Sequence, residues 1–108
     1  MGCSMEEQCM YEIELEVPIG VRQGMLYLHI REKQISGKIS VLGSVESFSG
    51  KVKEQEEIEV EGELRSAYRK IHYHGSGKRT EDMLEMALAG SFGTYRLRGK
   101  YLCGVTAE

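Results

Sequence analysis

Hydrophobic and polar residues alternate along most of this chain from residue 11 onward. The segment YEIELEV at 11–17 places Tyr11, Ile13, Leu15 and Val17 on one face and three glutamates on the other. A period of two indicates a half-buried β-strand, whereas an amphipathic helix repeats its apolar positions every 3.6 residues. No long segment keeps the helical period, so the sequence predicts an all-β protein.

The alternation predicts a chain of short strands separated by turns rich in glycine, serine and charged residues. The predicted strands are eight in number and lie at 11–17, 25–30, 35–42, 46–53, 57–65, 69–77, 82–89 and 94–103. Short links favour antiparallel neighbours, and eight strands with one apolar face can close into a barrel without a free edge. We therefore predict one domain at 10–103, an eight-stranded antiparallel up-and-down β-barrel. A flexible tail is expected at 1–9 and a short tail at 104–108, and a β-sandwich is the alternative fold.

A glycine recurs between core-type residues, as in ISGKI at 35–39 and FSGKV at 48–52. Five such glycines share the inward parity of their apolar neighbours, at spacings of 13, 12, 13 and 24 residues: Gly37, Gly50, Gly62, Gly75 and Gly99. Even spacing in a meander places each glycine near the middle of its strand, and so predicts a belt around the waist of the barrel. Small residues there either let a narrow barrel coil and close or leave space for a ligand.

Charged residues offer an independent test of closure, because opposite charges on directly paired residues are favourable and like charges are not. If the last strand pairs with the first, the expected neighbours are Arg96 and Glu16, Arg98 and Glu14, and Lys100 and Glu12. The same register predicts Tyr11 beside Tyr101 and Cys9 beside Cys103. A second acidic row is expected between two basic ones, with Glu59, Glu61 and Glu63 between Lys51 and Lys53 on one side and Lys70, His72 and His74 on the other.

The links at the two ends of the predicted barrel differ in character. At one end REKQ (31–34), KEQEE (53–57) and KRTED (78–82) are charged turns with no recognisable binding feature. The links at the other end are longer and carry apolar residues and arginines, which are typical of a binding surface at a barrel mouth. The predicted ligand-binding residues are Arg22, Tyr68, Arg69, Tyr73, Phe92 and Tyr95. The alternative interpretation is that these side chains fold inward and plug the barrel.

Other chemistry is weakly indicated. His72 and His74 lie on one face of a strand, as some metal sites require, but facing glutamates explain them as cross-strand pairs. The segment GSGKRT at 75–80 lacks the spacing of a phosphate-binding loop and indicates a hairpin turn. We therefore predict no catalytic residue, no metal ligand and no cofactor.

Composition narrows the class of protein. The chain has 108 residues, 41% of them hydrophobic and 29% charged, and a net charge of −3, which argues against a general nucleic-acid binder. No stretch reaches the about 18–20 apolar residues that span a bilayer, and the start MGCSMEEQCM lacks the apolar run of a signal peptide. Three cysteines without CxxC spacing fit reduced thiols. A cytoplasmic location is expected, without membrane or nucleic-acid partners.

In layout the chain resembles the avidin and lipocalin-like barrels, and more closely the small bacterial barrel proteins built from repeated G-x-I/L strands, on the strength of repeats such as ISGKI and FSGKV. It has no tryptophan, whereas avidin-type biotin pockets are walled by tryptophans and lipocalins carry a GxW signature. The resemblance therefore implies a barrel fold and not a biotin site.

The leading hypothesis for function is a small binding module that takes a small amphipathic, anionic ligand at the mouth near Arg22, Tyr68, Arg69 and Phe92. The alternative is a protein–protein interaction or self-association module that uses the same apolar loops. A barrel-shaped isomerase or cyclase that uses the interior tyrosines Tyr73 and Tyr95 is the third hypothesis.

Overall fold

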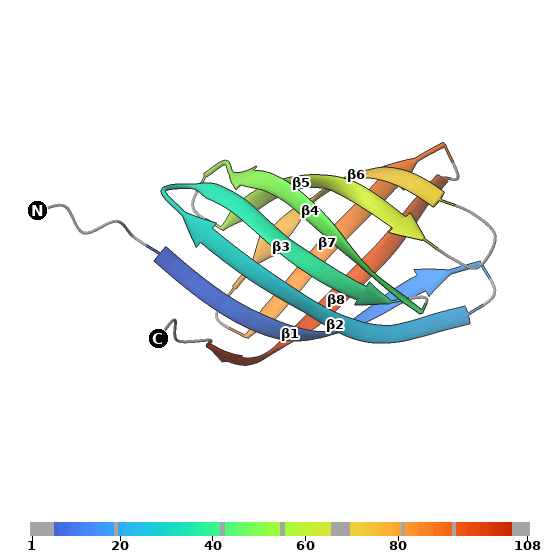
Figure 1. Ribbon diagram of the computed structural model, residues 1–108, viewed down its shortest axis with the longest axis horizontal. Helices are drawn as coiled ribbons and strands as arrows, with labels where there is room; N and C mark the ends of the chain where they lie inside the picture. The colour runs from blue at the N-terminus through green and yellow to red at the C-terminus, as the bar shows by residue number, and fades with distance from the viewer. Residues whose placement is uncertain are drawn as a thin grey trace, which may run out of the picture.

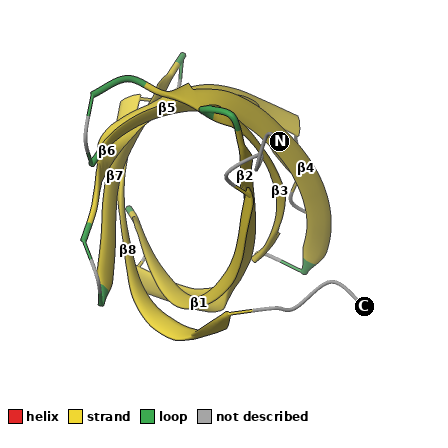
Figure 2. Cartoon of the chain, turned by 90° about the vertical axis from the view of Figure 1, so that its left-hand side faces the viewer, coloured by secondary structure: helices red, strands yellow, loops and turns green. Residues whose placement is uncertain are grey.

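The computed structural model describes residues 6–18, 20–41, 43–54, 56–65, 70–80, 82–91 and 93–104. It contains β1 (Glu6–Val17), β2 (Gly20–Arg31), β3 (Gln34–Val41), β4 (Ser44–Val52), β5 (Glu57–Arg65), β6 (Lys70–Arg79), β7 (Met83–Gly90) and β8 (Gly93–Gly104). Each strand pairs antiparallel with the next, and β8 pairs with β1 to close the barrel (Figures 1 and 2). The predicted eight-stranded up-and-down barrel is confirmed. None of the described segments is a helix able to cross a membrane.

The first two strands are longer than the alternation predicts. β1 begins at Glu6 and β2 at Gly20, each five residues before the predicted start. The sequences EEQCM and GVRQG are too polar to show an apolar face, yet their backbones pair along the whole hairpin from Glu6↔Arg31 to Val17↔Gly20. Residues 6–9, which we expected in a tail, therefore belong to the sheet.

The seam between β1 and β8 has the predicted charge register. Lys100, Arg98 and Arg96 lie opposite Glu12, Glu14 and Glu16, and Tyr101 lies opposite Tyr11. The prediction that Cys9 faces Cys103 is wrong, because Cys9 pairs with Gly104 and Met10 with Cys103. A register shift between Met10 and Tyr11 leaves Leu102 as an extra residue on β8, and such a bulge moves every later pair by one position.

The second charge row also lies where it was predicted. On β5, Glu59 pairs with Lys51 of β4, while Glu61 and Glu63 pair with His74 and His72 of β6. The ion pairs in this row run diagonally, with 3.6 Å between Lys53 and Glu59 and 3.5 Å between Lys70 and Glu63. Their side chains are exposed to solvent, so these pairs specify register more than they add stability.

The core fills the inside of the barrel with apolar side chains from all eight strands. No polar or charged side chain is buried among the described residues, and the largest side chains that lose nearly all contact with solvent include Tyr11 and Tyr73. The described interior is apolar except for the hydroxyls of Tyr11 and Tyr73.

The belt glycines lie opposite large side chains of the core and leave room for them. Each belt glycine pairs on both neighbouring strands with a large residue; Gly37 and Gly62, for example, flank Phe48. A Cβ at Gly37 would come within 2.6 Å of the Phe48 ring, and a Cβ at Gly62 within 2.9 Å of the Phe48 Cβ. Alternation of small and large residues lets opposite walls interdigitate in a narrow barrel. The belt therefore serves closure, and these positions hold no space for a ligand.

Candidate functional site at the Arg79 end

The structure describes three of the six residues predicted to bind a ligand. Tyr68, Arg69 and Phe92 lie outside the described residues. Arg22 is half-buried near the start of β2, opposite Leu15. Tyr73 is buried and Tyr95 packs partly buried against the core, in the half of the barrel that Arg22 borders. The two tyrosines thus contribute to packing there, and the predicted mouth stays a prediction.

Tyr73 has the properties of a structural phenol. Its side chain is 2% exposed, and burial raises its pKa to about 12. The phenol is therefore neutral at physiological pH and a poor general base. This finding gives no support to an enzyme that uses Tyr73 for proton transfer.

The opposite end of the barrel, which Figure 2 faces, carries an open recess of about 530 Å³. Its lining comes from strands that are far apart in the sequence and from two turns: Glu7, Cys9, Tyr11, Glu56, Arg79, Thr80, Asp82 and Tyr101. This is the end whose charged turns showed no binding feature in the sequence.

Arg79 organises the recess. It is the last residue of β6 and has the inward parity of Tyr73 and Gly75, so its side chain projects over the end of the core. Its Nη1 donates a hydrogen bond to the hydroxyl of Tyr11 at 3.2 Å, and its Nη2 pairs with the carboxylate of Glu7. Because β7 and β8 separate β6 from β1 in the closed sheet, the guanidinium spans the mouth from one wall to another.

The three side chains differ in their exposure. The Arg79 side chain is 20% exposed, whereas that of Glu7 is 55% exposed, and Tyr11 is fully buried. Arg79 thus covers the end of the core with its aliphatic stem and keeps its charged head at the rim. The carboxylate of Glu7 contacts Arg79 and is otherwise open to solvent on the outer side of the recess, as far as the described residues show.

Electrostatics follow from this arrangement. Burial of the Arg79 guanidinium disfavours its charge, but the hydrogen bonds and charges of Tyr11 and Glu7 outweigh burial and leave its pKa raised. Burial raises the pKa of Tyr11, and Arg79 opposes that rise only in part. At neutral pH the recess therefore holds a permanent cation beside a neutral phenol that keeps its proton.

Backbone hydrogen bonds fix the turns around the recess. The N–H of Arg79 donates to the carbonyl of Glu56 at 2.9 Å, and the N–H of Tyr101 donates to the carbonyl of Asp82 at 2.8 Å. Tyr101 is 36% exposed and meets Tyr11 edge to face, with ring centroids 5.8 Å apart. The acidic turn residues and the exposed ring thus have set places at the rim.

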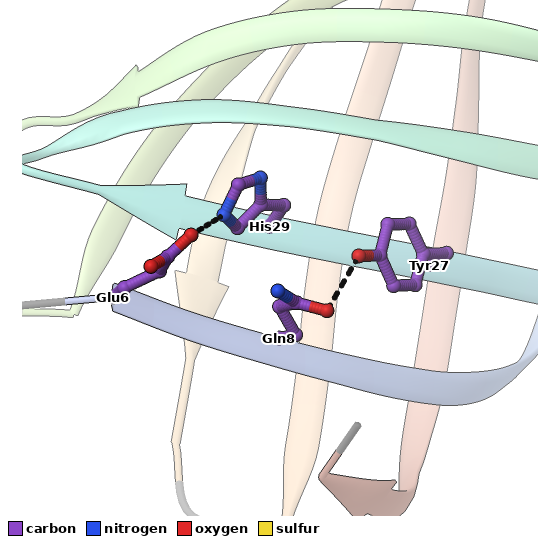
Figure 3. A network of polar contacts seen from close by, with 4 residues as sticks. All are labelled: Glu6, Gln8, Tyr27 and His29. Carbon is purple, nitrogen blue, oxygen red and sulfur yellow. Dashed lines mark hydrogen bonds and ion pairs between the residues drawn. The ribbon is translucent and has the colours of Figure 1, made fainter. Parts of the chain in front are cut away.

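A polar network on the outer surface holds the start of β1 (Figure 3). Within the described residues, the pairing of β1 with β8 begins at Cys9, so Glu6, Glu7 and Gln8 pair there with β2 alone. Glu6 contacts His29 at 2.7 Å, and the hydroxyl of Tyr27 donates to Gln8 at 2.9 Å. These contacts flank Glu7 in the sequence and steady the segment that presents its carboxylate to Arg79.

The described residues contain no group of three His, Cys, Asp or Glu side chains that could hold a metal ion. His72 and His74 instead face the glutamates of β5 across the outer surface. Cys9 is a buried thiol at the base of the recess.

Comparison of the chain with protein-family models, with curated proteins and with solved structures found no match.

Sequence reasoning missed the Arg79 site although one signal for it was present. Arg79 lies six residues after Tyr73, and Glu7 lies four residues before Tyr11. Both therefore share the inward parity of these core tyrosines. Charged residues at inward positions beyond the end of a core point into a mouth. Arg79 falls in the charged turn predicted at 78–82 and Glu7 in the tail predicted at 1–9, so neither was considered for the site.

Proposed function

We propose that this protein is a small binding module whose ligand places a carboxylate on Arg79 at this end of the barrel. The observation that carries the proposal is the pairing of Arg79, whose side chain is largely buried, with the exposed carboxylate of Glu7 in an open recess. Glu7 occupies the position of the ligand's carboxylate when no ligand is bound. This retains the anionic ligand expected from the sequence but moves it to the other mouth.

The chemistry of the recess suits this exchange. A guanidinium offers several donors in one plane and matches a carboxylate with two parallel hydrogen bonds. The buried hydroxyl of Tyr11 accepts a hydrogen bond from Arg79 and so helps to hold the guanidinium at the mouth. An apolar portion of the ligand would rest against the exposed ring of Tyr101. Because Glu7 competes for the same donors, binding is expected to be weak, and removal of this competitor should strengthen it.

Titration of the labelled protein with hexanoate, followed by two-dimensional NMR, tests the proposal. Hexanoate should shift the amide signals around Arg79, Tyr101 and Glu7. Arg79→Gln should abolish the shifts, and Glu7→Gln should tighten binding several-fold. The matched control is Arg22→Gln, which removes an arginine at the other mouth and should leave hexanoate binding intact.

Two results would count against this assignment. Loss of binding in Arg22→Gln, with retention in Arg79→Gln, would return the ligand to the mouth predicted from sequence. Shifts that ignore both arginines would show that neither mouth holds the carboxylate. If Arg79→Gln does not fold, Glu7→Gln still tests the proposal. Weaker hexanoate binding by Glu7→Gln would contradict the idea that Glu7 competes with the ligand for Arg79.

A second candidate function, self-association through the Arg22 end, is favoured by two exposed apolar residues. Val21 is 51% exposed and Val45 is 61% exposed, and both lie near the links at that end. Light scattering over a range of concentrations should then show a dimer that Val45→Glu breaks. Met83→Glu is the matched control, since Met83 is 42% exposed at the opposite end. A monomer at every concentration would remove this candidate.

A further inference from the structure

The charge of the recess restricts the ligand beyond its carboxylate. The residues that line it carry three carboxylates and one guanidinium, a net charge of −2: Glu7, Glu56, Asp82 and Arg79. The three carboxylates among them repel a ligand that carries only negative charge. A carboxylate ligand that also carries a positive charge is therefore expected to bind at Arg79 more tightly than a simple anion such as hexanoate.

We infer that the ligand is a zwitterion, with its carboxylate on Arg79 and an ammonium group at the acidic rim beside Tyr101. This inference rests on the proposed function and names the ligand class, which is an amino acid or an amine-bearing carboxylic acid. It accounts for both signs of charge in one small recess.

The places of the rim residues support this arrangement. Glu56 is tied to Arg79 and Asp82 to Tyr101 by the backbone hydrogen bonds already described, so one acidic residue adjoins the carboxylate site and the other adjoins the exposed ring. The face of an exposed tyrosine ring attracts an ammonium group through its quadrupole. Once displaced from Arg79, the carboxylate of Glu7 is a further acceptor for the ammonium.

Ligands that differ in one charge test the inference directly. 6-Aminohexanoate and its N-acetyl derivative share the chain and the carboxylate, but only the first has an ammonium group, and hexylamine has the ammonium alone. We include 4-aminobutyrate and glycine as shorter zwitterions. Two-dimensional NMR titrations at low ionic strength should show the best-fitting zwitterion binding at least about fivefold more tightly than N-acetyl-6-aminohexanoate, since two exposed contacts add about 1 kcal/mol.

Variants separate the two halves of the site. Asp82→Asn and Glu56→Gln should reduce the advantage of the zwitterion while leaving N-acetyl-6-aminohexanoate bound as well as before, or better. Glu54→Gln, in the same turn as Glu56 but outside the lining of the recess, is the control and should change neither ligand. Added salt should reduce the advantage, because the rim is exposed.

The outcomes distinguish the inference from the proposed function. Equal binding of the zwitterion and the acetylated ligand, lost in Arg79→Gln, would overturn the inference and leave the carboxylate site standing. Binding of hexylamine alone would overturn both, as would a series in which no carboxylate shifts the signals around Arg79.

Discussion

At the scale of single residues, the fate of inward polar groups depends on where they lie along the barrel. Tyr73 lies within the core and is sealed from solvent, whereas Arg79, six residues further along the same strand face, reaches the mouth. The same alternation thus places a phenol in the core and a guanidinium at the mouth. Parity identifies the inward face, but depth in the barrel decides the role.

Arg79→Met should destabilise the protein by roughly 1–3 kcal/mol, because Tyr11 would keep a buried hydroxyl without its partner. The methionine retains most of the stem that covers the core. Adding Tyr11→Phe to Arg79→Met should recover much of the loss, as measured by urea denaturation. If the double variant is less stable than Arg79→Met alone, the hydroxyl has another partner and this account is wrong.

Tyr73 should make stability depend on pH above 10. The phenol ionises near 10 in the unfolded chain but only near pH 12 in the folded protein. Its contribution is therefore complete below pH 10 and is lost as the pH rises toward 12, by roughly 2–3 kcal/mol. The unfolding free energy of the wild type should therefore fall relative to that of Tyr73→Phe, which has no phenol to ionise, as the pH rises from 10 to 12. A difference that stays constant would show that the phenol titrates alike in both states.

At the scale of secondary structure elements, close approach of neighbouring strands explains why glycine is needed at mid-strand. At Gly50 on β4, a Cβ would lie 1.9 Å from the carbonyl oxygen of Glu59 on β5. That atom belongs to the backbone of the paired strand and cannot move aside as a side chain can. The strands therefore have to separate to admit any side chain there.

Gly50→Ala should destabilise the protein by about 1–3 kcal/mol, the usual cost of overpacking. Strand propensity alone predicts the opposite sign, because alanine is better than glycine inside a strand by about 0.5–1 kcal/mol. Thermal or urea unfolding decides between the two. Ser49→Ala, on the exposed neighbouring residue, is the control and should change stability by less than about 0.5 kcal/mol. A more stable Gly50→Ala would contradict the close approach.

At the scale of the whole molecule, closure makes the first and last strands neighbours, and charges along this seam specify their register. Arg98 on β8 is paired with Glu14 on β1 and with Glu85 on β7. Arg96 is paired with Glu16 on β1 but with the uncharged Ala87 on β7. The two arginines therefore differ in how many acidic neighbours closure gives them.

Arg98→Glu should cost more stability than Arg96→Glu, because it places like charges opposite one another on both sides. Each such pair is worth roughly 0.2–1 kcal/mol, so the difference should be of that size and should shrink in high salt. Urea denaturation at two salt concentrations measures it. If the two variants lost equal stability, or if Arg96→Glu lost more, the pairing of Arg98 with acidic residues on both neighbouring strands would be contradicted.

Much of the fold could be predicted because its determinants are local or repeat along the chain. Alternation of apolar residues identifies each strand, short links make neighbours antiparallel, and the paired charges of Glu14 and Arg98 indicate closure. The prediction failed where polar residues pair by backbone alone, as at the start of β1, and where one extra residue on β8 shifts Cys9 away from Cys103. A bulge has no period and leaves no pattern to find.

The candidate site depended on contacts that no local pattern records. Arg79 is 68 residues from Tyr11 and 72 from Glu7 in the chain, and they meet only because the closed sheet brings the ends of β6 and β1 to one mouth. The ligand, the cytoplasmic location and the partners stay predictions. The sequence by itself determines where the strands lie and which strands pair, because the period of two follows from backbone geometry and short links join neighbouring strands. Which charged side chains share a mouth depends on the tilt, register and closure of all eight strands together, and only the folded barrel sets these.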